Sequence, residues 1–161
     1  MRDFTLNTLR LLLSALKEQQ YTFQTFAGFL KGPAARAVIL RHDVDARRMN
    51  ALVTAKMEAA MGITGTYYFR IVPQSFDADI IRQIASLGHE IGYHYEDLSA
   101  AGGDPGKAIL LFEQNLDRLR HIVPVETICM HGSPLSKYDN RKLWEEYNYR
   151  DYGIIGEPYF D

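Results

Sequence analysis

Ionisable side chains follow three apolar segments of the sequence. The run at 37–40 leads into Asp43 and Asp45, and later runs lead into His94 and His131. Carboxylates and imidazoles are the side chains that bind transition metals and that move protons near neutral pH. The pattern therefore indicates metal-assisted or general acid–base chemistry, provided that the fold brings the ends of these segments together.

The two aspartates are spaced for a shared cation. In an extended segment Asp43 and Asp45 project to the same side, because side chains alternate with a period of two. Carboxylates so close repel each other unless a cation lies beside them. Asp45, His94 and His131 would supply one carboxylate and two imidazoles, a set that leaves a position open for water on zinc and that also suits manganese, cobalt or iron. Asp43 would then be the general base.

Two alternatives remain open for these residues. Asp45 could instead cap the helix that is predicted to follow it, and His131 could be a hydrogen-bonded loop residue.

His89 lies five residues before His94, so on one strand the two face opposite sides about 16 Å apart. We therefore expect His89 to be structural. A nucleophilic pair of Cys129 with His131 is conceivable, but the cysteine would be buried inside its strand.

Helical and extended segments alternate along the chain. Helices are predicted at about 5–19, 46–61, 77–87, 106–121 and 139–147, and strands at 37–43, 64–71, 90–94, 125–130 and 152–155. Such alternation predicts a parallel sheet with helices on its faces. In sheets of this kind the chemistry lies at the carboxyl ends of the strands, where the candidate residues stand.

Composition narrows the class of protein. The 161 residues suit one domain, and a formal net charge of −2 gives no electrostatic footprint for nucleic acid. Arg10 and Lys17 interrupt the leucines near the N-terminus, which argues against a signal peptide. No segment has the roughly 18 apolar residues that cross a membrane. With Cys129 the only cysteine, we expect a cytoplasmic protein without membrane association.

Two segments resemble motifs of the polysaccharide deacetylase (NodB-homology) family, which includes chitin and peptidoglycan deacetylases. Residues 39–45, Ile-Leu-Arg-His-Asp-Val-Asp, resemble the His-Asp-Val-Asp variant of the family's first motif. Residues 87–94, Leu-Gly-His-Glu-Ile-Gly-Tyr-His, are similar to its Gly-His-Glu-Ile-Gly-Asn-His segment. The unit between them, ending at 66–69, looks like the family's second βα unit. The resemblance covers about 36–135 well and the remainder loosely.

The resemblance implies a parallel (β/α) barrel of the distorted seven-stranded deacetylase type. Only five strands are predicted here, so we expect the barrel to be incomplete in this chain. Either the chain is a piece of a longer protein, which we favour, or a homo-oligomer covers its open sheet edges. The expected organisation is one domain over 1–161, with an N-terminal helical extension at about 1–35.

The family also assigns roles to residues. Asp43 corresponds to its catalytic base, and Asp45 and His94 to two metal ligands. Its second histidine lies four residues after the first, where this chain has Leu98. We infer that His131 replaces that ligand, with a nearby glutamate as the fallback.

Other positions also depart from the family. Residues 131–134, His-Gly-Ser-Pro, stand where the family's third motif begins with arginine. The family's C-terminal histidine, its general acid, has no counterpart before Asp161. The glutamate that could serve as the fallback metal ligand is Glu96. Glu96 and Arg70 are also candidates for contacting the substrate.

The resulting hypothesis is a hydrolase that uses a divalent metal ion, with zinc favoured, to remove acetyl groups from N-acetylated sugars or polysaccharides. One alternative is a hydrolase of another amide C–N bond. The other is a catalytically silent, sugar-binding barrel, which the missing histidine at Leu98 and the missing C-terminal acid would favour.

Overall fold

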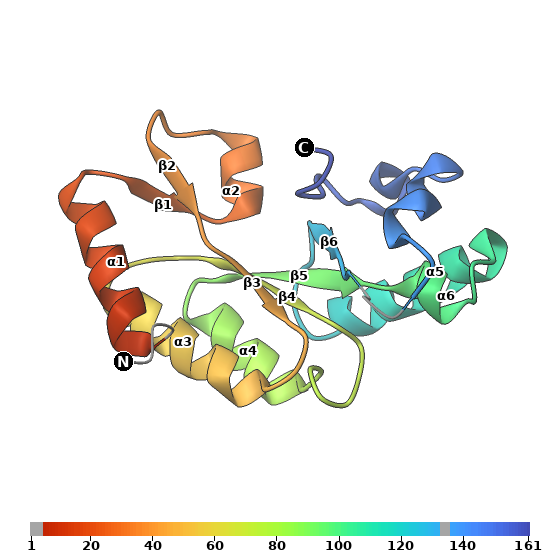
Figure 1. Ribbon diagram of the computed structural model, residues 1–161, viewed down its shortest axis with the longest axis horizontal. Helices are drawn as coiled ribbons and strands as arrows, with labels where there is room; N and C mark the ends of the chain where they lie inside the picture. The colour runs from red at the N-terminus through yellow and green to blue at the C-terminus, as the bar shows by residue number, and fades with distance from the viewer. Residues whose placement is uncertain (1–4, 133–135) are drawn as a thin grey trace.

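Four parallel strands form the main sheet of the computed structural model, which describes residues 5–132 and 136–161 (Figure 1). Their order in the sheet is β3 (Arg41–Val44), β4 (Thr66–Phe69), β5 (Glu90–Tyr95) and β6 (Ile128–Met130). Every pairing between neighbours is parallel, so the carboxyl ends of the strands lie along one edge. The predicted parallel arrangement of these four strands is confirmed.

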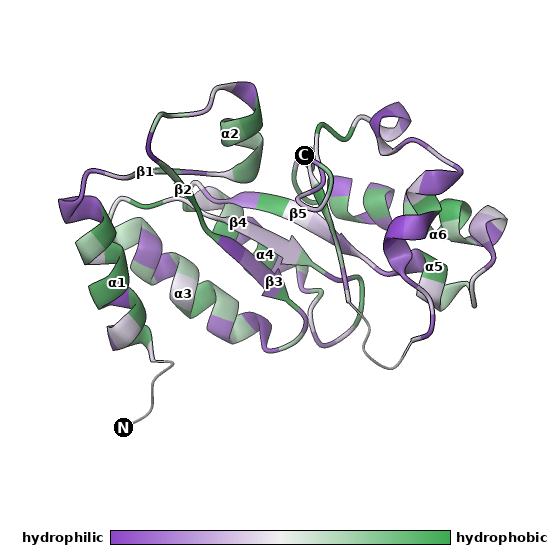
Figure 2. Cartoon of the chain, turned by 45° about the horizontal axis from the view of Figure 1, so that its top comes forward, coloured by the Kyte–Doolittle hydropathy of each residue, from purple (hydrophilic) through white to green (hydrophobic). Residues whose placement is uncertain are grey.

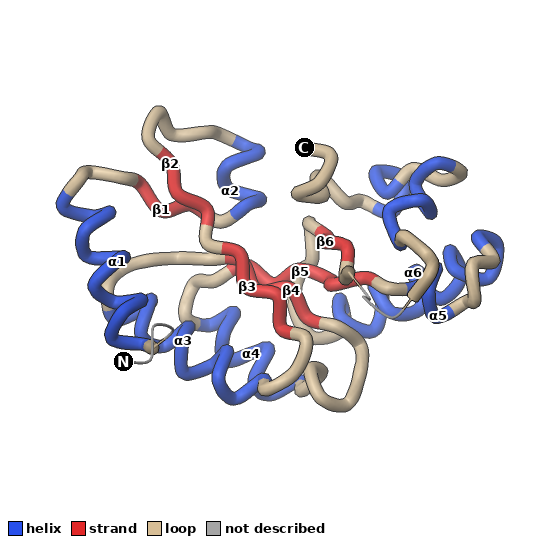
Figure 3. Tube along the Cα trace, in the orientation of Figure 1, coloured by secondary structure: helices blue, strands red, loops and turns tan. Residues whose placement is uncertain are grey.

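Helices connect successive strands and pack on the sheet. The crossovers contain α3 (Arg48–Ala60), α4 (Ala78–Ser86), and α5 (Asp97–Ala100) with α6 (Pro105–Arg120). The longer helices begin and end within two residues of their predicted limits. On α6, Ala108, Phe112, Leu116 and Leu119 are buried at helical spacing in the main core. The result is a mixed α/β fold whose parallel strands curl as a half-barrel (Figure 3), consistent with an incomplete barrel.

The segment before β3 is more varied than the predicted helical extension. It contains α1 (Leu6–Glu18), β1 (Thr22–Gln24), α2 (Phe26–Lys31) and β2 (Ala37–Ile39). The segment predicted as one strand over 37–43 is divided at Leu40: β2 pairs with β1, whereas β3 pairs with β4. At the start of α2, the N–H of Ala27 donates to Glu90 at the amino end of β5, so α2 is tied to the edge opposite the candidate residues.

α1 packs on α3 through a second, smaller core. Leu13, Met57 and Ile63 are buried there together, and Figure 2 shows apolar and polar residues interspersed along both helices. The helix predicted at about 5–19 is therefore present as α1. Within residues 5–132 and 136–161, no helix is long and apolar enough to cross a membrane.

The C-terminal part differs from the prediction. The helix expected at 139–147 is the 3-10 helix η1 (Asn140–Glu145), followed by η2 (Tyr149–Tyr152). The strand expected at 152–155 is wrong: Gly153 turns the chain with φ 70°, and only an isolated parallel bridge between Thr127 and Gly156 follows. That bridge nevertheless continues the sheet beyond β6, because the N–H of Ile128 donates to the carbonyl of Gly156.

Candidate metal centre

Three side chains from three strand ends converge at the carboxyl edge of the sheet. Asp45 follows β3, His94 lies in β5, and His131 follows β6. The Asp45 Oδ1 atom lies 3.0 Å from His131 Nδ1 and 3.4 Å from His94 Nε2, and the two ring nitrogens are 3.3 Å apart. Each residue thus offers one ligand atom within 4.8 Å of the others. The residues expected from the sequence to share a metal lie together.

Asp45 does not cap the following helix. α3 begins at Arg48, and its N-cap residue, Arg47, has a left-handed backbone (φ 52°) and makes no side-chain capping bond. The alternative interpretation of Asp45 is therefore wrong. Its carboxylate is directed to the two imidazoles and remains half exposed, so this centre is open to solvent.

The His94 ring is held in one orientation by the neighbouring strand. Its Nδ1 lies 2.8 Å from the carbonyl oxygen of Cys129, which can only accept, so Nδ1 carries the proton and Nε2 presents a lone pair. Burial lowers the pKa of His94, which favours the neutral ring that a metal needs. A backbone carbonyl that fixes the other ring nitrogen is the usual support of a metal-binding histidine.

His131 is fixed by its backbone and faces a second ion pair. Its N–H donates to the carbonyl of Tyr95, and its carbonyl accepts from Asn140. While Nδ1 faces Asp45, Nε2 lies 3.8 Å from a carboxylate oxygen of Glu96. Both Glu96 oxygens accept hydrogen bonds of 2.7–2.9 Å from Arg70. The two residues predicted to contact substrate are thus paired with each other beside the centre, and each keeps about a fifth of its side chain exposed.

Asp43 lies next to the centre and is held by an arginine that the sequence analysis did not single out. Arg41 Nε donates to Oδ1 at 3.0 Å and Nη2 to Oδ2 at 2.7 Å. Burial lowers the pKa of Arg41, but hydrogen bonds to Asp43 and Tyr159 raise it above its ordinary value, so the guanidinium is charged. The spacing of two along a strand, which puts both side chains on one face, could have revealed this pair.

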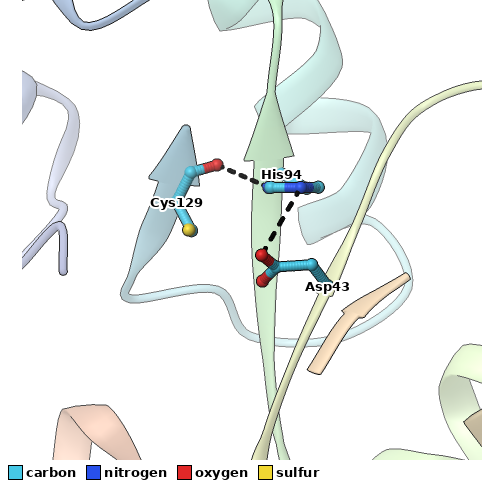
Figure 4. Close-up of side chains that lie close together, drawn as sticks. All are labelled: Asp43, His94 and Cys129. Carbon is cyan, nitrogen blue, oxygen red and sulfur yellow. Dashed lines mark hydrogen bonds and ion pairs between the residues drawn. The ribbon is translucent and has the colours of Figure 1, made fainter. Parts of the chain in front are cut away.

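Asp43 also belongs to a second group of possible ligands. Figure 4 shows it with His94 and Cys129, on β3, β5 and β6. The Asp43 Oδ2 atom is 4.0 Å from His94 Nε2, and each of the three residues offers a ligand atom within 4.8 Å of the others. Burial raises the pKa of the Cys129 thiol, so this cysteine is a neutral thiol rather than an activated nucleophile.

Two other positions have structural roles. His89 Nδ1 accepts from the N–H of Gly65, and its Nε2 donates to the carbonyl of Ala55. Both ring nitrogens are engaged near the amino edge, as expected for a structural histidine. Leu98 lies on α5 in the main hydrophobic core, so that position contributes packing. The second imidazole near Asp45 is that of His131, which follows β6.

The donor set at this edge fits a divalent transition metal. One carboxylate and two imidazole nitrogens are a ligand combination of open zinc sites. The buried His94 has its lone pair directed at an acidic group and is fixed from behind, as such a ligand requires. The geometry therefore supports metal binding without identifying the metal.

Comparison with known proteins gives a structural relative. No family model matches the sequence, and no curated protein matches it. A solved structure, the Streptococcus pyogenes deacetylase PplD in complex with acetate, aligns with a TM-score of 0.68 over 90% of this chain and 70% of that one. The aligned sequences are 17% identical. The similarity shows a shared fold with a deacetylase.

Proposed function

We propose that this chain is a metal-dependent hydrolase that removes acetyl groups from N-acetylated sugars, with zinc as the favoured metal. The observation that carries the proposal is the convergence of Asp45, His94 and His131 beside a second carboxylate, Asp43. The structural likeness to a deacetylase supports the same reaction class. A barrel of the seven-stranded deacetylase type, incomplete in this chain, and a cytoplasmic location belong to the same proposal.

Each residue at the centre has a defined task in this reaction. A bound zinc ion would polarise the acetyl carbonyl and make water more acidic. Asp43 accepts the proton of the attacking water, because its carboxylate lies beside the ligands and is fixed by Arg41. His94 and His131 keep their ligand atoms aligned through the backbone contacts of their strands. The products are acetate and a free amine.

Arg70 and Glu96 border the centre and are proposed to bind polar groups of the substrate. Arg70 has five N–H donors, and those on Nη1 make only a long contact, 3.4 Å, with the carbonyl of Asp45. A planar guanidinium of this kind suits the hydroxyl, amide and acidic groups of sugars. Pairing with Glu96 holds it beside His131, because Glu96 lies 3.8 Å from the Nε2 atom of that residue.

The proposal is tested by measuring acetate release. The zinc-loaded chain is incubated with N-acetylglucosamine oligomers, and Asp43→Asn is compared with Asp79→Asn, the same change at a largely exposed aspartate on α4. Loss of the general base should lower kcat by about 10²–10⁴, whereas Asp79→Asn should match the unmodified protein. Zinc bound without acetate release from sugars or other amides would favour the silent-barrel alternative.

A further inference from the structure

The two groups of possible ligands share one histidine and are mutually exclusive. Asp45, His94 and His131 form one group, and Asp43, His94 and Cys129 form the other. A thiolate, an imidazole and a carboxylate bind zinc at least as well as two imidazoles and a carboxylate. The types of ligand in the two groups therefore do not explain why an ion would bind to the first group rather than the second.

Occupation of the second group would disable the proposed reaction. Asp43 would become a ligand and could no longer accept a proton from water. Cys129 is fully buried and His94 nearly so, so an ion there would be withdrawn from solvent and from a bulky substrate. The proposed reaction therefore requires an interaction that disfavours metal binding at this second group.

Arg41 forms an ion pair with Asp43, the carboxylate that an ion in the second group would need as a ligand. Its guanidinium donates to both oxygens of Asp43, and it is positioned in turn by Tyr159, whose hydroxyl is 3.4 Å from Nη2 and whose ring centroid is 5.3 Å from Cζ. A divalent ion bound to Asp43 would lie within a few ångströms of this fixed positive charge. At such distances two cations repel strongly in a partly buried site.

We propose that Arg41 is a positioning residue that excludes the ion from the Asp43–His94–Cys129 group, directs it to Asp45, His94 and His131, and so keeps Asp43 free as a base. This inference rests on the proposed function. It assigns different tasks to the two aspartates through a residue that itself contacts neither ion nor substrate. Asp45 has no such partner, since the structure gives its carboxylate contacts only with His94 and His131 among the described residues.

Cobalt(II) in place of zinc tests the inference without relying on activity. A thiolate bound to cobalt gives a near-ultraviolet charge-transfer absorption that imidazole and carboxylate ligands do not give, and the thiol loses its proton when it binds. The full chain should bind cobalt without this band. In Arg41→Met the band should appear, and in the double variant Arg41→Met, Cys129→Ser it should vanish. With zinc, Arg41→Met should retain the metal but lose at least about tenfold in kcat.

Matched variants separate positioning from folding. Arg41→Lys keeps the charge and should suppress the band, even if it recovers only part of kcat. Arg82→Met removes an arginine from an exposed pair on α4 and should behave like the unmodified protein. A band already present in the unmodified protein, or none in a folded, cobalt-loaded Arg41→Met, overturns the inference while leaving the proposed function intact. Failure of the unmodified chain to bind cobalt or zinc contradicts the proposed function, and the inference falls with it.

Discussion

A buried carboxyl group at the start of α5 should make the stability of this protein fall as pH rises. Asp97 is 1% exposed. It accepts hydrogen bonds from Tyr93 Oη at 2.9 Å and from Asn115 Nδ2 at 2.8 Å. Burial raises the pKa of Asp97 to about 6 from 3.8, although these hydrogen bonds act in the opposite direction. The folded chain therefore binds a proton at this site over a range of pH in which the unfolded chain has lost it.

The sign and size of the effect follow from proton linkage. A group whose pKa is higher in the folded state contributes stability that is fully present below its unfolded pKa and is lost as pH rises through the folded value. The window here runs from about pH 4 to above pH 6. A difference of about two pH units corresponds to a change of about 2–3 kcal/mol in the free energy of unfolding.

Urea unfolding of the unmodified chain and of Asp97→Asn measures this change. Asparagine has nearly the same shape, keeps an acceptor for Tyr93, and does not titrate. Urea titrations of both proteins are carried out at several pH values between 4 and 7. A chelator is present, so that metal binding does not contribute to the free energy of unfolding. The stability of the unmodified chain relative to the variant should fall by about 2–3 kcal/mol across this range. Parallel curves would refute the argument, because they would mean that Asp97 is ionised in the folded state throughout.

Two further changes test packing and substrate binding. Gly92→Ala should destabilise the fold by about 1–3 kcal/mol, because a Cβ there would lie 2.2 Å from the Tyr68 ring and 3.0 Å from the carbonyl oxygen of Thr127. Gly32→Ala is the control, since its Cβ would meet nothing within 4 Å, and equal urea midpoints for the two variants would contradict the packing argument. Arg70→Met should raise KM for an N-acetylated oligosaccharide about tenfold, the loss of roughly one charged hydrogen bond, while zinc content stays unchanged. An unaltered KM would remove Arg70 from the substrate site.

Local patterns in the sequence were sufficient for the elements that place the site. Among the crossover helices, α4 and α6 begin after aspartates, Asp77 and Asp104, whose side chains accept backbone N–H groups of the first turn. The parallel order of β3 to β6 then brings residues after separate strands to one edge. That geometry is why His94 and His131, 37 residues apart, could be expected to meet.

Features that depend on which strand or turn a segment packs against in the fold could not be predicted from local sequence patterns. The extended segment around Leu40 looks continuous in the sequence, and its division into β2 and β3 is decided by which strand lies beside each half. Near the C-terminus, Tyr152 to Ile155 has the composition of a strand. The side chain of Asn148 accepts from Arg150 N–H to start η2, and Gly153 then reverses the chain, so local turn chemistry prevails over β propensity.

Zinc content after dialysis tests the central claim most directly. His94 lies in both groups of possible ligands found among the described residues and is more buried than Asp45 and His131, so an ion in either group would bind it. His121→Ala is the matched control, because that exposed ring lies at the end of α6, where its Nδ1 donates to the carbonyl of Asp117. The unmodified chain and His121→Ala should retain stoichiometric zinc, and His94→Ala should lose both the zinc and acetate release. Zinc and activity that persist in a folded His94→Ala protein would contradict the assignment of this centre.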